Sequence, residues 1–278
     1  MKDLVFAQLQ HSLAARYVPE RALGHGAMAS VYLARDLKLQ RLVAIKALRL
    51  STDVLVARER FLREIRYLAQ LQHPNILPLF DSGDANGLLY YVTAYVEGET
   101  LGVRLRATPG HRLSIEETVR LSREIGDALD YAHTRNILHR DVKPDNILLS
   151  AEHALVADFG IARAIQLAGE EVLTETGVAI GTPAYMSPEQ LAADRQLDAR
   201  SDVYALGCVV YEMLAGVQPF MGARGVVENS QKFIGLPVSV TDLRPEVPIK
   251  MAAATLRALS IDPADRFSSA GDFVAAFA

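Results

Sequence analysis

The sequence predicts an α+β chain built as two lobes. About the first hundred residues read mainly as strands with one long helix, and the remainder reads mainly as helices. A short connector, YVEGETL, joins the two parts. With 278 residues, 50% of them hydrophobic, each part is long enough to bury a core of its own. Such an arrangement leaves a cleft between the parts, and clefts of this kind hold ligands.

The strand-rich part contains two apolar strand segments followed by an amphipathic helix. YLARD and RLVAIKAL are predicted strands, and a helix is expected over about 53–71. In that helix Phe61, Ile65 and Leu68 recur at i, i+4 and i+7, which predicts a core-facing stripe. Glu64 lies one turn before Leu68, so its carboxylate is expected at the border of the buried face.

Further along the chain, apolar patterns alternate with stop and start signals. LLYYVTAY is another predicted strand, and SIEE from Ser114 is a capping-box pattern that opens a helix through about His133. ILLSAEHALVADFG predicts two short strands around a polar turn. A helix that is apolar almost all round is expected to start at Ser201-Asp202 and to stop at Gly216.

Charge and composition argue against several classes of partner. A formal net charge of -4 without any basic run disfavours binding to nucleic acid or to an anionic membrane. The one cysteine, Cys208, is expected to be a buried, inert thiol. The start of the chain lacks the apolar core of a signal peptide, and the longest apolar stretch, 203–211, is too short to cross a bilayer. We therefore expect a cytoplasmic location without membrane contact by these residues, including the case of a cytosolic fragment of a longer protein.

A glycine motif and a strand lysine are the first candidate ligand-binding features. Residues 24–31, GHGAMASV, begin like the phosphate-binding loop G-x-G-x-x-G-x-V, although Ala29 occupies the third glycine position. Taken alone, this stretch fits an ordinary turn between strands better than a phosphate-binding loop. In RLVAIKAL, Ala44 and Lys46 share one face because strand side chains alternate, and a methyl group beside a cation suits a flat ring with a charged tail. Glu64 is placed to pair with Lys46, which favours a functional role over a surface lysine.

The stretch ILHRDVKPDNILL carries more chemistry than any other. It is a polar loop broken by a proline and flanked by apolar runs. In it Asp141 can accept a hydroxyl proton, Lys143 can neutralise a phosphate oxygen, and Asn146 can bind a divalent metal. Asp158, in ADFG after an apolar run, is a carboxylate suited to a hard cation. A polar loop whose groups satisfy one another is the alternative, and the fixed order of these residues makes it the weaker one.

In this order the motifs resemble the eukaryotic-type (Hanks-type) protein kinases, and the style of the motifs resembles their bacterial subgroup. The resemblance runs from about Tyr17 to the end of the chain. It implies a two-lobed protein kinase fold in one catalytic domain over 1–278. Within that domain it implies an N-lobe over about 17–93, a hinge over about 94–98 and a C-lobe over about 99–278.

The resemblance also implies a role for each motif residue. Gly24 and Gly26 would cover the phosphates of ATP, while Lys46 would contact the α- and β-phosphates and pair with Glu64. Asp141 would orient the attacking hydroxyl and take its proton. The two residues implied to hold Mg²⁺, with Mn²⁺ as an alternative metal, are Asn146 and Asp158.

The adenine site follows from the same resemblance. The positions that sandwich the adenine ring in the family correspond to Val31, Ala44 and Leu148. Only backbone groups of the hinge need to reach adenine, so Ala94 and Val96 are expected to supply C=O and N–H.

Two features indicate transfer to serine or threonine. Lys143 in HRDVKPDN resembles serine/threonine kinases, and in the family the residue that matches Thr182 bonds to the aspartate and lysine of the catalytic loop. Supporting contacts are also expected: Glu189 with Arg266, and Asp202 with the backbone of the catalytic loop.

The segment between Asp158 and SPE is long enough to be a functional loop. Our hypothesis is that phosphorylation of Thr176, with Thr174 as a second site, orders this loop. The phosphate clamp would be Arg140 together with Arg163, because two guanidinium groups bind a phosphate well.

The main expectation is an ATP- and Mg²⁺-dependent protein serine/threonine kinase that acts on proteins and phosphorylates its own activation loop, with self-association for transfer in trans. A pseudokinase that binds nucleotide or partners without phosphoryl transfer is the first alternative, and a small-molecule phosphotransferase the second. Residues 216–250 carry no interpretable motif, and partner contacts are expected there.

Overall fold

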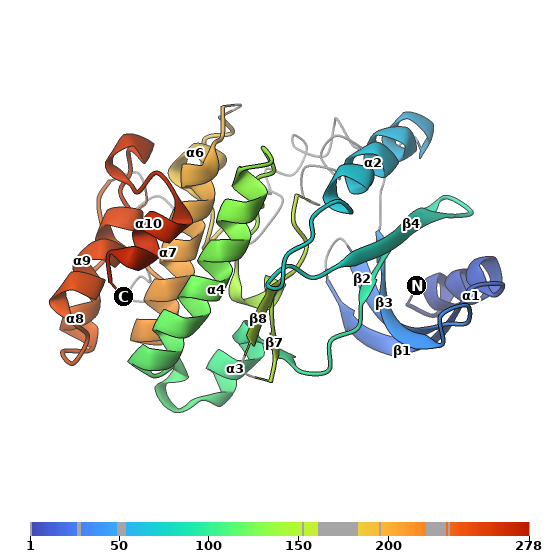
Figure 1. Ribbon diagram of the computed structural model, residues 1–278, viewed down its shortest axis with the longest axis horizontal. Helices are drawn as coiled ribbons and strands as arrows, with labels where there is room; N and C mark the ends of the chain where they lie inside the picture. Colours follow the sequence, from blue (N-terminus) through green and yellow to red (C-terminus); the bar gives the residue numbers. More distant parts are fainter. Residues whose placement is uncertain are drawn as a thin grey trace. The chain divides into compact units, whose positions relative to one another are not determined.

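The computed structural model describes residues 2–26, 29–48, 54–151, 153–160, 183–194, 196–220, 232 and 234–277 (Figure 1). The described residues form two compact units. Of the described residues, the N-terminal unit holds those up to 72 together with 77–97, and the C-terminal unit holds 73–76 and those from 98 onward.

The N-terminal unit is an antiparallel sheet with two helices. Its five strands follow the spatial order β1-β2-β3-β5-β4. The strands are β1 (Tyr17–His25), β2 (Ala29–Asp36), β3 (Arg41–Leu48), β4 (Leu79–Ala85) and β5 (Leu88–Ala94). The helices are α1 (Lys2–Leu13) and α2 (Val54–Leu68).

The two faces of this sheet have different tasks because strand side chains alternate. One face carries Tyr32, Val43, Ile45 and Val92, all fully or almost fully buried in a core that also contains Leu9 of α1. The opposite face carries the alternate residues of the same strands. These include the predicted ligand-binding residues Val31, Ala44 and Lys46. Helix α1 was not predicted from the sequence, and it covers the apolar face.

The predicted stripe of α2 is confirmed. Phe61 and Ile65 are buried almost completely and Leu68 is 9% exposed, while Arg63 and Arg66 lie on the exposed side. The helix ends at Leu68, three residues before the predicted end.

The C-terminal unit combines a small sheet of order β6-β7-β8 with a set of helices. The strands are β6 (Glu99–Thr100), β7 (Ile147–Ser150) and β8 (His153–Val156). The α-helices are α3 (Leu101–Ala107), α4 (Ile115–His133), α6 (Pro188–Leu191), α7 (Ala199–Ala215), α8 (Val240–Leu243), α9 (Ile249–Ala258) and α10 (Ala270–Ala275). Single 3₁₀ turns cover Pro109–His111, Pro144–Asn146 and Pro263–Asp265.

Helix α7 is the centre of this unit, and it packs against α4, α9 and α10 (Figure 1). Its all-round apolar sequence is buried as predicted. The helix begins at Ala199, two residues before the predicted start, because Asp198 caps it by accepting a hydrogen bond from Arg200 N at 2.9 Å. It ends as predicted at Gly216, whose φ of 76° and close approach to Gly110 O leave no room for a side chain.

Helix α4 opens at its predicted N-cap. Ser114 Oγ accepts a hydrogen bond from Glu117 N at 3.0 Å. The Glu117 carboxylate does not complete the capping box as expected, and lies instead 3.3 Å from Arg104 Nη1. An ion pair to a neighbouring helix has replaced the local hydrogen bond.

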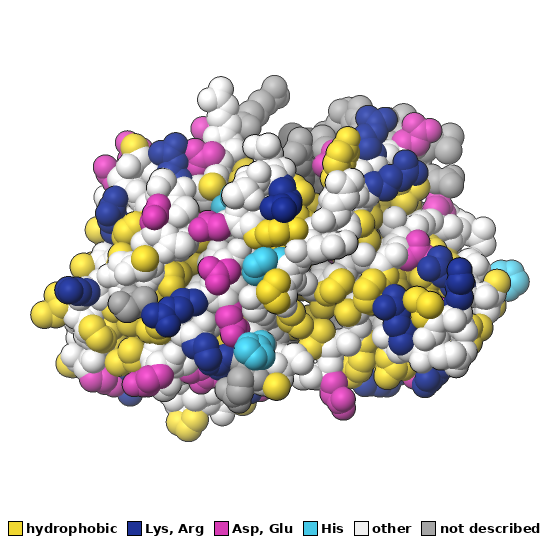
Figure 2. Space-filling model, in the orientation of Figure 1, with side chains coloured by type: hydrophobic (Ala, Val, Ile, Leu, Met, Phe, Trp, Pro, Cys, Tyr) yellow, Lys and Arg dark blue, Asp and Glu magenta, His cyan; other side chains and the backbone are white. Residues whose placement is uncertain are grey.

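Basic and acidic side chains are interspersed over the helices of the C-terminal unit on the face shown in Figure 2. Among the described helices, none combines the length and the apolar character that a membrane span requires.

Candidate active site

The loop between α4 and β7 brings three predicted residues into direct contact. Lys143 Nζ lies 2.6 Å from Asp141 Oδ2. Asn146 Nδ2 donates to the same carboxylate oxygen at 3.0 Å and to the Asp141 backbone oxygen at 2.8 Å. Pro144 starts the 3₁₀ turn that carries Asn146 back toward Asp141, since its fixed φ suits the first position of a helical turn. The Asp141 carboxylate therefore has a fixed position and remains partly exposed to solvent.

Asp202 holds the backbone of this loop from α7, as predicted. Its two carboxylate oxygens accept hydrogen bonds from His139 N and Arg140 N, each at 2.8 Å. His133 Nε2 lies 2.8 Å from the same carboxylate. Burial opposes the charge of Asp202, but His133 and the loop N–H groups outweigh burial and hold the pKa of Asp202 below its usual value. A buried anion thus fixes the residues that precede Asp141, of which Arg140 adopts a left-handed φ of 68°.

Asn146 and Asp158 are tied together through the backbone. Ala157 N donates to Asn146 O at 2.9 Å, and Ala157 O lies 2.8 Å from His139 Nε2. The backbone of Asp158 has a φ of 64°, in the left-handed region that residues other than glycine adopt only uncommonly. Strain of this kind persists where surrounding contacts impose it, and it collects at functional sites.

The donor atoms of this pair fit a hard divalent cation. Both hydrogen bonds from the Asn146 side chain to described residues use Nδ2, which leaves the amide oxygen as a ligand. The Asp158 carboxylate supplies oxygen donors of the kind that Mg²⁺ prefers. In the described part of the chain no cluster of three or more His, Cys, Asp or Glu side chains could hold a metal. Two protein ligands suit Mg²⁺, which usually keeps several waters and binds substrate phosphates.

In the N-terminal unit, strand register places the predicted nucleotide residues in one row. Gly24 pairs with Val31, Val31 with Lys46, and Lys46 with Tyr91 across β1, β2, β3 and β5. Directly paired residues have their side chains on the same face of a sheet. The Lys46 ammonium accordingly lies 5.9 Å from the centre of the Tyr91 ring. Ala44 belongs to the same face, because it lies two residues before Lys46.

The glycine motif has space above it. A side chain built at Gly24 would meet no described atom within 4 Å, and one at Gly26 would lie 3.5 Å from Ala29 O. Gly26 N donates to Ala29 O at 2.8 Å, which closes the turn between β1 and β2. Packing among the described residues therefore does not require glycine at position 24.

The remaining predicted residues have the following places. Glu64 is half-buried on α2, at the border of the buried stripe as expected. Ala94 ends β5 and its backbone N donates to Pro78 O at 3.1 Å, while Val96 follows in the connector. Leu148 is half-buried on β7 of the C-terminal unit. The predicted residues that lie outside the described parts of the chain are Arg163, Thr174, Thr176 and Thr182.

The predicted ion pair after the activation loop is confirmed. Arg266 donates from Nη1 and Nη2 to the two carboxylate oxygens of Glu189, at 2.7 and 2.8 Å. Ser201 Oγ adds a third hydrogen bond to Glu189. Burial alone would raise the pKa of Glu189, but Arg266 and Ser201 hold it below its usual range.

Sequence reasoning missed a second group of polar residues, of which Tyr185 is buried and the others are partly buried. Tyr185 Oη donates to Glu212 Oε2 at 2.5 Å and accepts from Gln218 Nε2 at 2.7 Å. Gln190 Nε2 donates to Arg140 O at 2.9 Å. Glu212 stands alone as a charged residue in the stretch of α7 after Asp202, and this position was the available signal.

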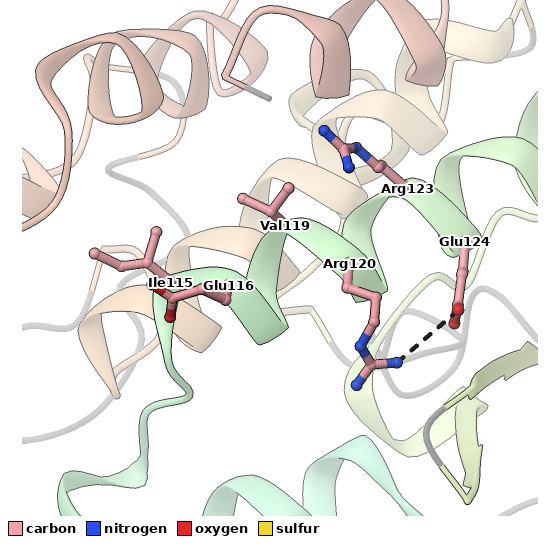
Figure 3. Close-up of a pocket in the computed structure, with 6 residues that line it drawn as sticks. All are labelled: Ile115, Glu116, Val119, Arg120, Arg123 and Glu124. Atoms are coloured by element: carbon pink, nitrogen blue, oxygen red, sulfur yellow. Dashed lines mark ion pairs between the residues drawn. The ribbon is translucent and has the colours of Figure 1, made fainter.

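A hollow on the surface of the C-terminal unit lies away from these residues. About 530 Å³ in volume, it is formed by one stretch of α4, from Ile115 to Glu124 (Figure 3). Arg120 and Glu124 form an i,i+4 ion pair of 3.9 Å on its edge. The residues that line it all belong to α4, so this hollow is separate from the loop that carries Asp141.

Comparison with known proteins assigns the class of protein. The profile of the protein kinase domain family matches residues 17–270. The chain therefore belongs to the protein kinase family. The family implies the use of ATP and a divalent metal, and it implies protein substrates.

Within the family, the chain is similar to bacterial kinases. The serine/threonine-protein kinase PknB of Mycolicibacterium smegmatis is 41% identical over 273 residues, and PknB of Mycobacterium leprae is 40% identical over 270. These matches cover 95% and 94% of this chain, but 42% of each relative, so the chain spans less than half their length. The crystal structure of the Mycobacterium tuberculosis PknI kinase domain superimposes with a TM-score of 0.75 and 32% identity, covering 95% of this chain and 94% of that one.

Proposed function

We propose that this chain is an active protein serine/threonine kinase domain, which transfers the γ-phosphoryl group of ATP to serine or threonine hydroxyl groups of proteins. The observation that carries the proposal is the Asp141 carboxylate, held by Lys143 at 2.6 Å and by Asn146 at 3.0 Å. A proton-accepting carboxylate needs a fixed position, a nearby cation and access to substrate, and Asp141 has all three.

In the proposed reaction the substrate hydroxyl oxygen forms a bond to the γ-phosphorus while the bond from this phosphorus to the β,γ-bridging oxygen breaks. ADP leaves with the electrons of that bond, and the hydroxyl proton passes to the Asp141 carboxylate. Lys143 offsets negative charge on the transferring group. Mg²⁺, or Mn²⁺ in its place, would be held by Asn146 and Asp158 and would neutralise phosphate charge.

Most of the proposed nucleotide contacts belong to the N-terminal unit. Gly24 and Gly26 bring the backbone close to the phosphates, and Lys46 contacts the α- and β-phosphates with Glu64 as its partner. The residues proposed to enclose adenine are Val31, Ala44 and Leu148, with backbone groups of Ala94 and Val96. The shared face of Val31, Ala44 and Lys46 supports this assignment.

Preference for serine and threonine rests on Lys143, on the predicted contact of Thr182 with the catalytic loop, and on the similarity to the bacterial serine/threonine kinases. The domain boundaries at about 17–93, 94–98 and 99–278 remain part of the proposal, as does a cytoplasmic location.

Regulation is proposed at the activation loop. Phosphorylated Thr176, with Thr174 second, would bind Arg140 and Arg163. Self-association of two chains would allow one to phosphorylate the other. This proposal predicts that an inactive Asp141→Asn chain becomes labelled when mixed with the wild-type chain, at a rate that rises with concentration.

The test of the proposed function is incubation with γ-labelled ATP, Mg²⁺ and a serine- and threonine-containing acceptor protein such as casein. Asp141→Asn should lower transfer roughly 100- to 10,000-fold, because it removes the proton acceptor but keeps the shape of the side chain. Asp145→Asn is the matched control, since Asp145 lies in the same loop with an exposed side chain. Equal labelling by the wild-type and Asp141→Asn chains would favour the pseudokinase alternative.

A further inference from the structure

Lys232 makes an unusual set of contacts in the C-terminal unit. Its side chain is almost fully buried, with 1% of the residue exposed. The Nζ atom donates to three backbone oxygens: Pro183 O at 2.8 Å, Ala184 O at 2.7 Å and Met186 O at 2.8 Å. Three of four consecutive carbonyl groups therefore converge on one ammonium group, from a residue more than 40 positions away in sequence.

A buried ammonium group needs a physical reason, because removing it from water is costly. None of the ion pairs between described residues includes Lys232, and its charge is offset by the three carbonyl dipoles and by the Tyr204 ring at 5.6 Å. Burial holds the pKa of Lys232 below its usual value. An ammonium group has three N–H donors, and each finds one acceptor here. A methionine would fill the same volume without the desolvation cost, but it would leave all three carbonyls without this donor.

The segment that Lys232 holds, Pro183–Met186, borders the catalytic loop. Together with that loop it encloses a small hollow, and the residues around the hollow are Arg140, Asp141, Val142, Tyr185, Met186 and Ala205. Because the carbonyls at 183, 184 and 186 turn toward Lys232, the course of the backbone beside Asp141 is fixed. Tyr185 is separately held by Glu212.

We propose that Lys232 is a positioning residue for the acceptor peptide: by binding three carbonyls of Pro183–Met186, it holds this segment in the shape that docks the substrate backbone next to Asp141. The proposal rests on the proposed kinase function. It assigns Lys232 a role in the affinity for the peptide and none in the binding of ATP or in proton transfer.

The test compares Lys232→Met, Lys232→Gln and the control Lys250→Met with the wild type, Lys250 being an exposed lysine of the same unit. Binding of a fluorescein-labelled peptide with the sequence of residues 168–180, AGEEVLTETGVAI, is measured by anisotropy, and KM and kcat are measured for the same peptide. Lys232→Met should raise the peptide Kd and KM roughly tenfold to a hundredfold, because hydrogen bonds to a charged donor are lost. Lys232→Gln, which keeps two donors, should fall between. The KM for ATP and the rate of ATP hydrolysis without peptide should change less than about twofold.

The outcomes separate this proposal from the proposed function. Absence of phosphoryl transfer by the wild-type chain would contradict the kinase function, while the anisotropy data would still report on Lys232. An unchanged peptide Kd and KM in Lys232→Met would overturn the positioning role. So would an equal fall in peptide affinity, ATP affinity and thermal stability, or failure of both Lys232 variants to fold, because each would make Lys232 a support of the unit as a whole.

Discussion

At the scale of single residues, the C-terminal unit uses buried charges to hold backbone segments. Asp202 is an anion and binds two N–H groups, whereas Lys232 is a cation and binds three C=O groups. Arg266 is also a cation that donates to backbone oxygens, including that of Ser260, and it pairs in addition with the Glu189 carboxylate. In each case the charge is opposite in sign to the partial charge of the backbone groups that it contacts. Removing one partner therefore leaves several groups unsatisfied at once.

The pair of Arg266 with Glu189 gives the first stability prediction. Arg266→Met should lower the free energy of unfolding by about 3–5 kcal/mol, because it leaves the buried Glu189 carboxylate uncompensated. Arg200→Met is the matched control: Arg200 pairs with Asp198 at 2.7 Å, but both side chains are more than a third exposed, so the loss should stay below about 1 kcal/mol. Urea unfolding of both variants gives the comparison. Equal losses in the two would contradict the role assigned to burial, and Arg266→Lys provides an intermediate if Arg266→Met does not fold.

The contacts of His133 predict a dependence of stability on pH. Burial opposes its charge, but the carboxylates of Asp130 and Asp202 outweigh burial and raise the pKa of His133 to about 9. The Asp130 contact is 3.8 Å, an ion pair without a hydrogen bond. Because the folded pKa exceeds the unfolded value of about 6.5, the stabilisation is complete below pH 6.5 and disappears as the pH rises through 9.

Between pH 6.5 and 9.5 the free energy of unfolding should therefore fall by about 1–3 kcal/mol. His133→Gln should remove this fall, whereas His153→Gln, at an exposed histidine paired with Glu124, should keep it. Urea unfolding at a series of pH values measures the effect. Parallel curves for the wild type and His133→Gln would contradict it.

At the scale of elements, α1 shows why local sequence is not enough. Val5, Leu9 and Leu13 recur with helical spacing, so a signal was present. An isolated helix of 12 residues is marginal in water, however, and α1 depends on a sheet face that no other described helix covers. The apolar sheet face on which α1 packs exists only once the strands have assembled, so the sequence of α1 alone does not reveal it. The long amphipathic α2 and the all-round apolar α7 were predictable because their patterns carry the information locally.

Helix α1 should contribute strongly to the stability of the N-terminal unit. Leu9 is fully buried against the sheet, so Leu9→Ala should lower the free energy of unfolding by about 2–5 kcal/mol. Leu4→Ala on the same helix is the control, since Leu4 is 70% exposed and should change stability by less than about 0.5 kcal/mol. Removal of residues 1–13 should lower Tm further than Leu9→Ala. Unchanged melting of the truncated chain would show that α1 is not part of the core.

At the scale of the whole molecule, motif order predicted more than composition did. Asp141, Lys143 and Asn146 were predictable because they lie within one short loop, where spacing dictates contact. The alignment of Gly24, Val31 and Lys46 followed from strand alternation and register. Lys232 was not predictable, because its three acceptors are near it only after the chain has folded and no local motif marks it. The assigned roles in nucleotide binding remain predictions.

Binding of ATP provides the test of those roles, because Lys46 is the proposed phosphate contact and Asp158 the proposed metal ligand. A ligand that binds only the native state at 100 times its Kd stabilises that state by about 2.7 kcal/mol, which for a chain of this size raises Tm by on the order of 5 °C. ATP with Mg²⁺ should therefore raise the Tm of the wild type, and either Lys46→Met or Asp158→Asn should reduce that shift. Lys38→Met, in the exposed turn between β2 and β3, should leave it intact. If Asp158 holds the metal, addition of Mg²⁺ should change the Tm shift of the wild type and of Lys46→Met but hardly that of Asp158→Asn. A full shift in either variant would contradict the role assigned to that residue, even if the chain proved to be a kinase.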